Sequence, residues 1–264
     1  MISMLQILLF LTLFPFLISS VDAEGYSLRY RLDEKGAKYK FKTVYRAKFT
    51  SLDEVRSLTE DISGTFQDLP VKILPRGGYR VSRSVHVENY VHNGREHPVE
   101  EYEKDLAGYE YILDPRKGKV KIVGSKTFDS RDAMEMVISF PRKEVKVGDT
   151  WRSSLYYNLK VGKQRKVPLK GVFKLTNVQG NIARIVGRYI GEVPPDRRMD
   201  YEGAVKWDCE FYFNLSKGEM ERGRVVTGLK YLSKTLIARE FFFQSKKKER
   251  IGYALHLTST FERD

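Results

Sequence analysis

The chain has 264 residues with 47 Lys and Arg against 34 Asp and Glu, which gives a formal net charge of +13, and it contains one cysteine. Its 41% hydrophobic content, with 16 Tyr and 15 Phe, is enough for a sizeable core and excludes a disordered or collagen-like chain. A single cysteine excludes an intramolecular disulfide and a zinc site built from cysteines.

The first 23 residues form a predicted secretory signal. Residues 5–18 are apolar with three exceptions, contain no Lys or Arg, and are too few to span a bilayer as a stable helix. Val21 and Ala23 fit the small-residue positions before a cleavage point, so we expect cleavage after Ala23. The alternative is a retained membrane anchor, since residues 1–4 supply no basic side chain.

The mature chain begins with the period-two alternation that is typical of β-strands. Residues 26–32 place Tyr and Leu at even positions, and residues 38–49 carry mainly apolar side chains at odd positions and basic ones at even positions. Successive strand side chains point to opposite faces, so the longer run should bury one face and expose cations on the other. These cations are candidate contacts for an anionic ligand: Lys38, Lys40, Lys42, Arg46 and Lys48.

Potential metal ligands cluster between residues 86 and 101, where His86, His92 and His97 accompany several acidic residues. If the chain folds as two strands around the Asn-Gly pair at 93–94, His92 and His97 approach one another. Imidazoles with a carboxylate would suit zinc or nickel. The alternative is solvated loop histidines, because Asn-Gly is also the ordinary requirement of a hairpin turn.

A second hairpin is predicted at residues 109–122. It turns through Asp-Pro-Arg-Lys-Gly at 114–118, where Pro pre-sets its own φ and Gly tolerates positive φ. Two short helices or turns are expected to pack against the sheet, one at residues 52–58 and one at residues 130–139, which Pro141 ends.

The segment 140–151, FPRKEVKVGDTW, resembles the pattern F-P-x-K-x-V-x-V-G-D-x-W of a family of uncharacterised secreted bacterial proteins. Other elements of that pattern occur at 108–118, 180–185 and 213–218, so the resemblance covers most of the mature chain. It implies a β-rich envelope protein, and it assigns no catalytic residues.

Within this segment, Gly148 and Asp149 have the composition of a turn in which Asp bonds forward to backbone N–H groups. Trp151 is expected to fill the core from the strand that follows. A role of Asp149 in a functional site is the alternative to this structural reading.

The second half continues the alternation. A hairpin is predicted across residues 155–175, the most apolar face of the chain lies at 207–215, and a last strand at 251–257 follows a basic turn at 246–250. Cys209 falls on the apolar face, where a free thiol behaves as a small hydrophobe.

The hairpins at 109–118 and 209–218 match at a shift of 100 residues, and two looser pairs of turns keep the same order. This offset predicts a duplicated antiparallel unit, with coincidence among similar hairpins as the alternative. The boundaries are then residues 24–139 and 140–264, either as two β units or as one continuous domain. The predicted fold class is mainly β, a curved antiparallel sheet of half-barrel or sandwich-like form with few short helices.

No motif for catalysis is present. The chain lacks a G-x-S-x-G elbow, a Cys-His arrangement and a phosphate-cradling loop, so we expect no enzyme activity and no cofactor. A glycosidase pair of carboxylates stays open, because acidic residues are numerous and their separation cannot be read from sequence.

The charge points to the class of partner. Loss of Asp22 with the signal raises the net charge from +13 to +14, and export makes nucleic acid a poor partner. Anionic lipid, glycan or an acidic protein of the envelope fits, and so does peripheral membrane contact. The leading hypothesis is a periplasmic or extracellular binding protein for an amphipathic anionic ligand such as lipid or lipopolysaccharide. We expect the concave, aromatic-rich face of the sheet to accept this ligand and the cationic flanks to attract its headgroup. The alternative is a structural or protein-interaction module whose basic surface serves solubility.

Overall fold

The computed structural model describes residues 25–50, 54–100, 108–123, 138–159, 165–193, 201–234 and 250–264. The predicted signal and most of the helix expected at 130–139 lie outside these ranges. The described residues form one 12-stranded sheet. Its strands are β1 (Ala37–Thr50), β2 (Val55–Ile73), β3 (Tyr79–His92), β4 (Arg95–Glu96), β5 (Tyr109–Asp114), β6 (Gly118–Val123), β7 (Thr150–Leu159), β8 (Arg165–Gln179), β9 (Ile182–Glu192), β10 (Tyr201–Asn214), β11 (Glu219–Lys234) and β12 (Arg250–Arg263).

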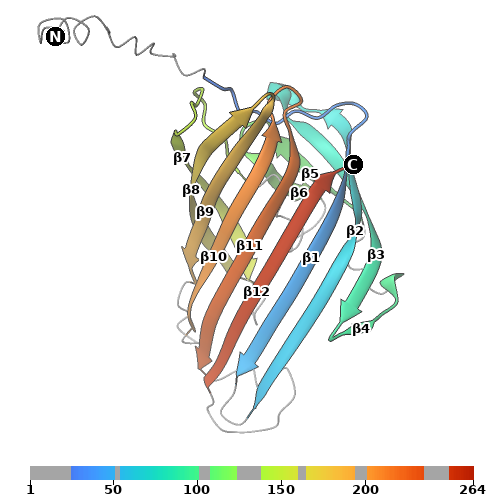
Figure 1. Cartoon of the computed structure of the whole chain (residues 1–264), viewed down its shortest axis with the longest axis vertical. Helices are drawn as coiled ribbons and strands as arrows, with labels where there is room; N and C mark the ends of the chain where they lie inside the picture. The colour runs from blue at the N-terminus through green and yellow to red at the C-terminus, as the bar shows by residue number, and fades with distance from the viewer. Residues whose placement is uncertain are drawn as a thin grey trace, which may run out of the picture.

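The sheet is antiparallel, curved and open, which confirms the predicted fold class (Figure 1). Its strand order is β6-β5-β3-β2-β1-β12-β11-β10-β9-β8-β7, with β4 paired to β3. β1 to β6 and β7 to β12 each form a meander, and β1 and β12 pair antiparallel to join them into one sheet. The division into two units and the duplication itself stay predictions.

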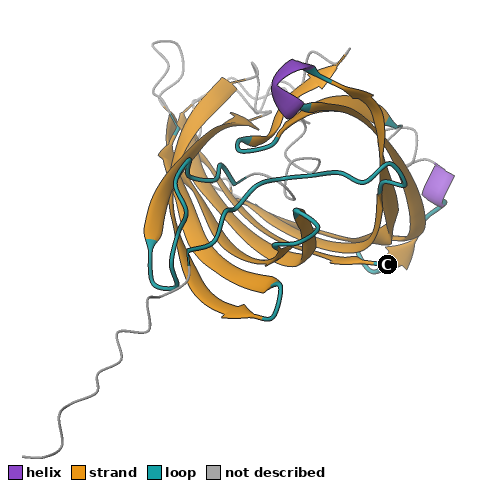
Figure 2. Cartoon of the chain, turned by 90° about the horizontal axis from the view of Figure 1, so that it is seen from above, coloured by secondary structure: helices purple, strands orange, loops and turns teal. Residues whose placement is uncertain are grey.

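Residues 25–36 do not form the strand that the alternation at 26–32 predicted. They run as an extended segment across the concave side at the upper end of the sheet in Figure 1, where the ends of β2 and β12 lie (Figure 2). The backbone of Tyr30 donates to Pro115 O at 2.6 Å, and that of Arg31 donates to Gly218 O at 2.8 Å. The segment thus bonds to the two hairpin turns that the 100-residue shift relates.

The helix expected at 52–58 is also wrong over its described part, because β2 begins at Val55. Pairing of β2 with β1 along its length overrides the weak helical spacing of three apolar residues. Among the described residues, a 3₁₀ turn lies at Pro75–Gly77, and residues 99–100 after β4 are also helical. None of their helices is long and apolar enough to cross a membrane.

The core fills the concave side. Tyr30 stacks on Phe140 with ring centroids 4.6 Å apart and meets Phe213 edge-on at 5.7 Å, so the crossing segment packs directly on the second meander. The hydroxyl of Tyr30 donates to Ile138 O at 3.2 Å. Residues 138–145 pack on the same core, and Tyr26 pairs with Val145.

An ion pair between Arg83 and Asp68 is buried in this interior. The guanidinium of Arg83 donates twice to Asp68, with Nε to Oδ1 at 2.7 Å and Nη2 to Oδ2 at 2.5 Å. The side chains are 3% and 0% exposed, and Arg83 also lies 4.0 Å above the ring of Phe66. This bidentate pairing gives the buried guanidinium and the buried carboxylate hydrogen-bond partners in place of water.

Candidate functional site

The cation ladder of β1 lies on the convex face. Lys38, Lys40, Lys42, Arg46 and Lys48 are all exposed, while Tyr39 and Ala47 between them are buried. The predicted alternation is therefore confirmed, and it separates a concave core from a basic outer surface.

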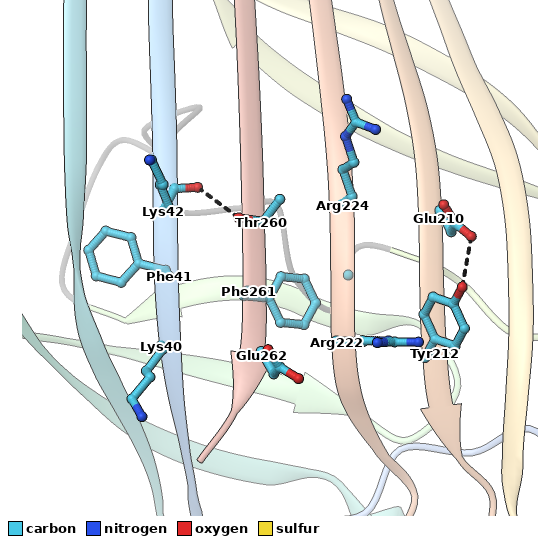
Figure 3. A pocket seen from close by; sticks show the side chains of 11 residues that line it. Lys40, Phe41, Lys42, Glu210, Tyr212, Arg222, Arg224, Thr260, Phe261 and Glu262 are labelled. Carbon is cyan, nitrogen blue, oxygen red and sulfur yellow. Dashed lines mark hydrogen bonds between the residues drawn. The ribbon is translucent and has the colours of Figure 1, made fainter.

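A shallow groove of about 340 Å³ crosses this convex face over β1, β12, β11 and β10 (Figure 3). Phe261 and Gly223 form part of its floor, and the ring of Phe261 lies on the core side, 6.0 Å from that of Tyr39. A Cβ atom on Gly223 would lie 2.5 Å from the Phe261 ring, so only a residue without a side chain leaves room for this ring next to β11. The side chains that line the groove on the outer face are Lys40, Lys42, Glu210, Tyr212, Arg222, Arg224, Thr260 and Glu262.

Strand pairing arranges these side chains in two rows. In the first row, Thr260 lies between Lys42 and Arg224. Directly opposite residues of antiparallel strands have Cβ atoms about 5 Å apart, so both cations reach the space above the Thr260 hydroxyl. Among the described residues, neither the Lys42 ammonium nor the Arg224 guanidinium has an acidic side chain within ion-pair distance.

The second row has its carboxylate between its two cations. Glu262 lies between Lys40 and Arg222, and Tyr212 follows on β10. The guanidinium of Arg222 stacks 4.1 Å above the Tyr212 ring. Each row therefore contains one carboxylate, because Glu210 lies opposite Arg224 in the first row. Glu210 is paired with Arg184 at 2.8 Å, whereas in the second row Glu262 lies between the two cations and Lys40 is paired with Asp264. The first row is the stronger anion site for this reason.

Ion pairs fix the rim of the groove. Lys40 Nζ lies 2.7 Å from Asp264, and this hydrogen bond raises the pKa of the Lys40 ammonium. At the other rim, Arg184 donates to Glu210 at 2.8 Å, which lowers the pKa of that carboxyl below its usual range. Both pairs therefore stay charged at neutral pH.

The other predicted ladder residues lie outside the groove. Lys38 is 3.4 Å from Asp264 and so shares that carboxylate with Lys40. Arg46 pairs across the strands with His256, and Lys48 with Ala254, farther along β1. The structure brings together two of the five predicted cations, Lys40 and Lys42.

The predicted hairpin around Asn93 is confirmed, and it brings His92 and His97 to a ring-centroid distance of 5.6 Å. His92 Nδ1 lies 3.4 Å from Glu60, and Asn93 Nδ2 lies 3.1 Å from His92 Nε2. Among the described residues, no three His, Cys, Asp or Glu side chains are placed to hold a metal ion.

The turn at Gly148 and Asp149 forms as expected, with Gly148 at φ +101°. The Asp149 carboxylate accepts a hydrogen bond at 2.9 Å from the backbone of Lys146, which precedes it in the chain, where the sequence suggested a bond forward. Trp151 is buried and donates through Nε1 to Ser139 O at 2.9 Å. Cys209 is buried as predicted, and burial raises the pKa of its thiol, so it is poorly suited to act as a nucleophile.

The sequence did not single out the groove residues of β10, β11 and β12. Arg222 and Arg224 alternate with buried residues just as the β1 cations do, and that alternation was the available signal. Which strands lie next to β1 depends on the β1–β12 pairing between the two ends of the chain.

Comparison of the chain with protein-family models and with curated proteins found no match.

Proposed function

We propose that the protein is an exported binding protein of the bacterial envelope and that its convex groove binds the anionic headgroup of an amphipathic ligand such as lipid or lipopolysaccharide. The observation that carries the proposal is the row in which Lys42 and Arg224 flank the Thr260 hydroxyl. A phosphate oxygen can accept from both cations, and hydrogen bonds to charged donors are the stronger kind. The Thr260 hydroxyl donates to Lys42 O at 3.4 Å and becomes a third donor once it turns away from that carbonyl (Figure 3).

The remaining groove residues fit a headgroup that carries hydroxyls beside its phosphate. Glu262 lies one row away from the proposed phosphate position and can accept hydrogen bonds from hydroxyls. The Tyr212 hydroxyl donates to Glu210 at 3.0 Å, so Tyr212 offers the lone pairs of that oxygen and a ring edge at the same end. A carboxylate this close disfavours a second phosphate, so one charged group per ligand is the best fit.

The alternative function is a structural or protein-interaction module with a solubilising basic surface. The packing of residues 25–36 and 138–145 on the concave side favours it, because this part of the apolar face is filled by the chain itself. Extraction of the purified protein followed by mass spectrometry separates the two. A co-purifying anionic lipid or glycolipid supports the binding protein, and a protein partner without such a ligand supports the module.

The groove is tested with short-chain phosphatidylglycerol, kept monomeric, in a calorimetric titration. Arg224→Glu should weaken binding at least tenfold, because a hydrogen bond to a charged group contributes about 1.5–3 kcal/mol and about 1.4 kcal/mol is tenfold in affinity. Lys230→Glu is the matched control, since Lys230 is exposed on the same strand but outside the groove. Equal losses in the two variants would show that general charge, and not the groove, binds the lipid.

A further inference from the structure

A second feature of the convex face lies on β7, β8 and β9, away from the groove strands. Tyr156, Val172 and Ile190 are 69%, 56% and 52% exposed. Pro168 is also exposed and lies opposite Tyr156 in the β7–β8 pairing. We call these four residues the apolar patch. Figure 1 shows their three strands side by side at one end of the sheet.

Basic side chains lie between the members of the patch. Val172 has Arg152 opposite it on β7 and Arg188 opposite it on β9. Ile190 has Lys170 opposite it on β8 and Lys206 opposite it on β10. All four cations are exposed. Each of these two aliphatic side chains is thus flanked by a cation on both neighbouring strands.

Acidic groups compensate only part of this charge. Asp208 pairs with Arg188 at 2.5 Å and with Lys206 at 2.9 Å, and Glu192 is exposed at the end of β9. Partial burial raises the pKa of the Asp208 carboxyl, but the hydrogen bonds and charges of Arg188 and Lys206 outweigh this effect and lower the pKa overall. Arg152 and Lys170 have no acidic partner within ion-pair distance among the described residues.

We propose that the apolar patch docks the protein on the surface of an anionic lipid bilayer. Apolar side chains alternate with Lys and Arg on this face, and such a surface fits the boundary between lipid headgroups and acyl chains. The apolar side chains would enter the outer part of the acyl region, while Lys and Arg would contact the anionic headgroups. Aromatic Tyr156 is the residue type that such interfaces favour.

A second copy of the chain is a poorer occupant. Face-to-face association would place the cations of two patches against each other, and like-charge contact disfavours binding. Four side chains also expose a few hundred Å² at most, below the roughly 800 Å² per partner of a stable interface. The inference goes beyond the proposed function, because the groove binds one headgroup and the patch recognises a surface.

The test measures flotation of the purified protein with vesicles of phosphatidylglycerol and phosphatidylcholine in equal parts, and with vesicles of phosphatidylcholine alone. Tyr156→Ser with Ile190→Ser should lower partitioning to the anionic vesicles about tenfold, through lost apolar burial. Arg152→Gln with Lys170→Gln should remove most of the preference for anionic vesicles. Val55→Ser with Val147→Ser removes exposed valines outside the patch and should change nothing.

Three results would overturn the inference. Unchanged flotation of the Tyr156 and Ile190 variant would show that the patch does not touch lipid. Loss of flotation in Arg224→Glu with the patch intact would assign vesicle binding to the groove. A dimer of the unaltered protein that the patch variant converts to a monomer would identify the patch as a self-association surface. Unchanged unfolding midpoints confirm that the variants fold.

Discussion

At the scale of single residues, the buried Asp68–Arg83 pair makes the sharpest stability prediction. Asp68→Leu leaves the Arg83 guanidinium buried without its carboxylate, and breaking such a pair costs about 3–5 kcal/mol. Urea unfolding followed by circular dichroism measures the loss. The double variant Asp68→Leu with Arg83→Met should be more stable than Asp68→Leu alone, because no unpaired charge remains. A loss below about 1 kcal/mol in Asp68→Leu would mean that water or another group compensates Arg83.

At the scale of elements, the crossing segment 25–36 is expected to stabilise the upper end of the sheet. Tyr30→Ala removes a ring that contacts Phe140 and Phe213, and should lower the free energy of unfolding by about 3–5 kcal/mol. Tyr30→Phe is the matched control, because it removes only the hydrogen bond to Ile138, which contributes about 1 kcal/mol. Similar losses in both variants, measured by urea unfolding, would show that the hydroxyl and not the ring holds the segment.

This segment also shows the limit of sequence patterns at the element scale. Alternation identified β1, the β5–β6 and β7–β8 hairpins and β10 correctly, because each has a core on one side and water on the other. Residues 26–32 alternate for a different reason. Leu28, Tyr30 and Leu32 point into the core from an extended segment that lies across the strands, and period-two alternation reports extended backbone without its partners.

At the scale of the whole molecule, pairing of β1 with β12 and of β12 with β11 makes one sheet of two meanders. Deletion of residues 250–264 exposes the edges of β1 and β11, so we expect aggregation and loss of the cooperative unfolding transition. Size-exclusion chromatography and circular dichroism measure both. Deletion of Asp264 alone is the control, since it removes surface ion pairs with Lys38 and Lys40. A monomeric deletion variant with a sharp transition would show that the meanders fold separately.

The candidate site follows the same division between local and long-range information. Lys40 and Lys42 could be selected from sequence because alternation placed them on a solvated face. Their groove partners Arg222, Arg224 and Thr260 lie about 180 to 220 positions later in the chain and become neighbours only through the β1–β12–β11 pairing. No local pattern specifies that order of strands.

The alternation that separates core from surface also separates two kinds of sequence change. Where the burial of side chains is described in β7 to β12, those on the convex face contact mainly one another and solvent, whereas their chain neighbours pack in the concave core. Substitutions on the convex face should therefore be nearly neutral for folding. Ligand preference could then diverge rapidly among relatives that keep the same interior, and a library of variants confined to convex positions could retarget the protein without redesigning its core.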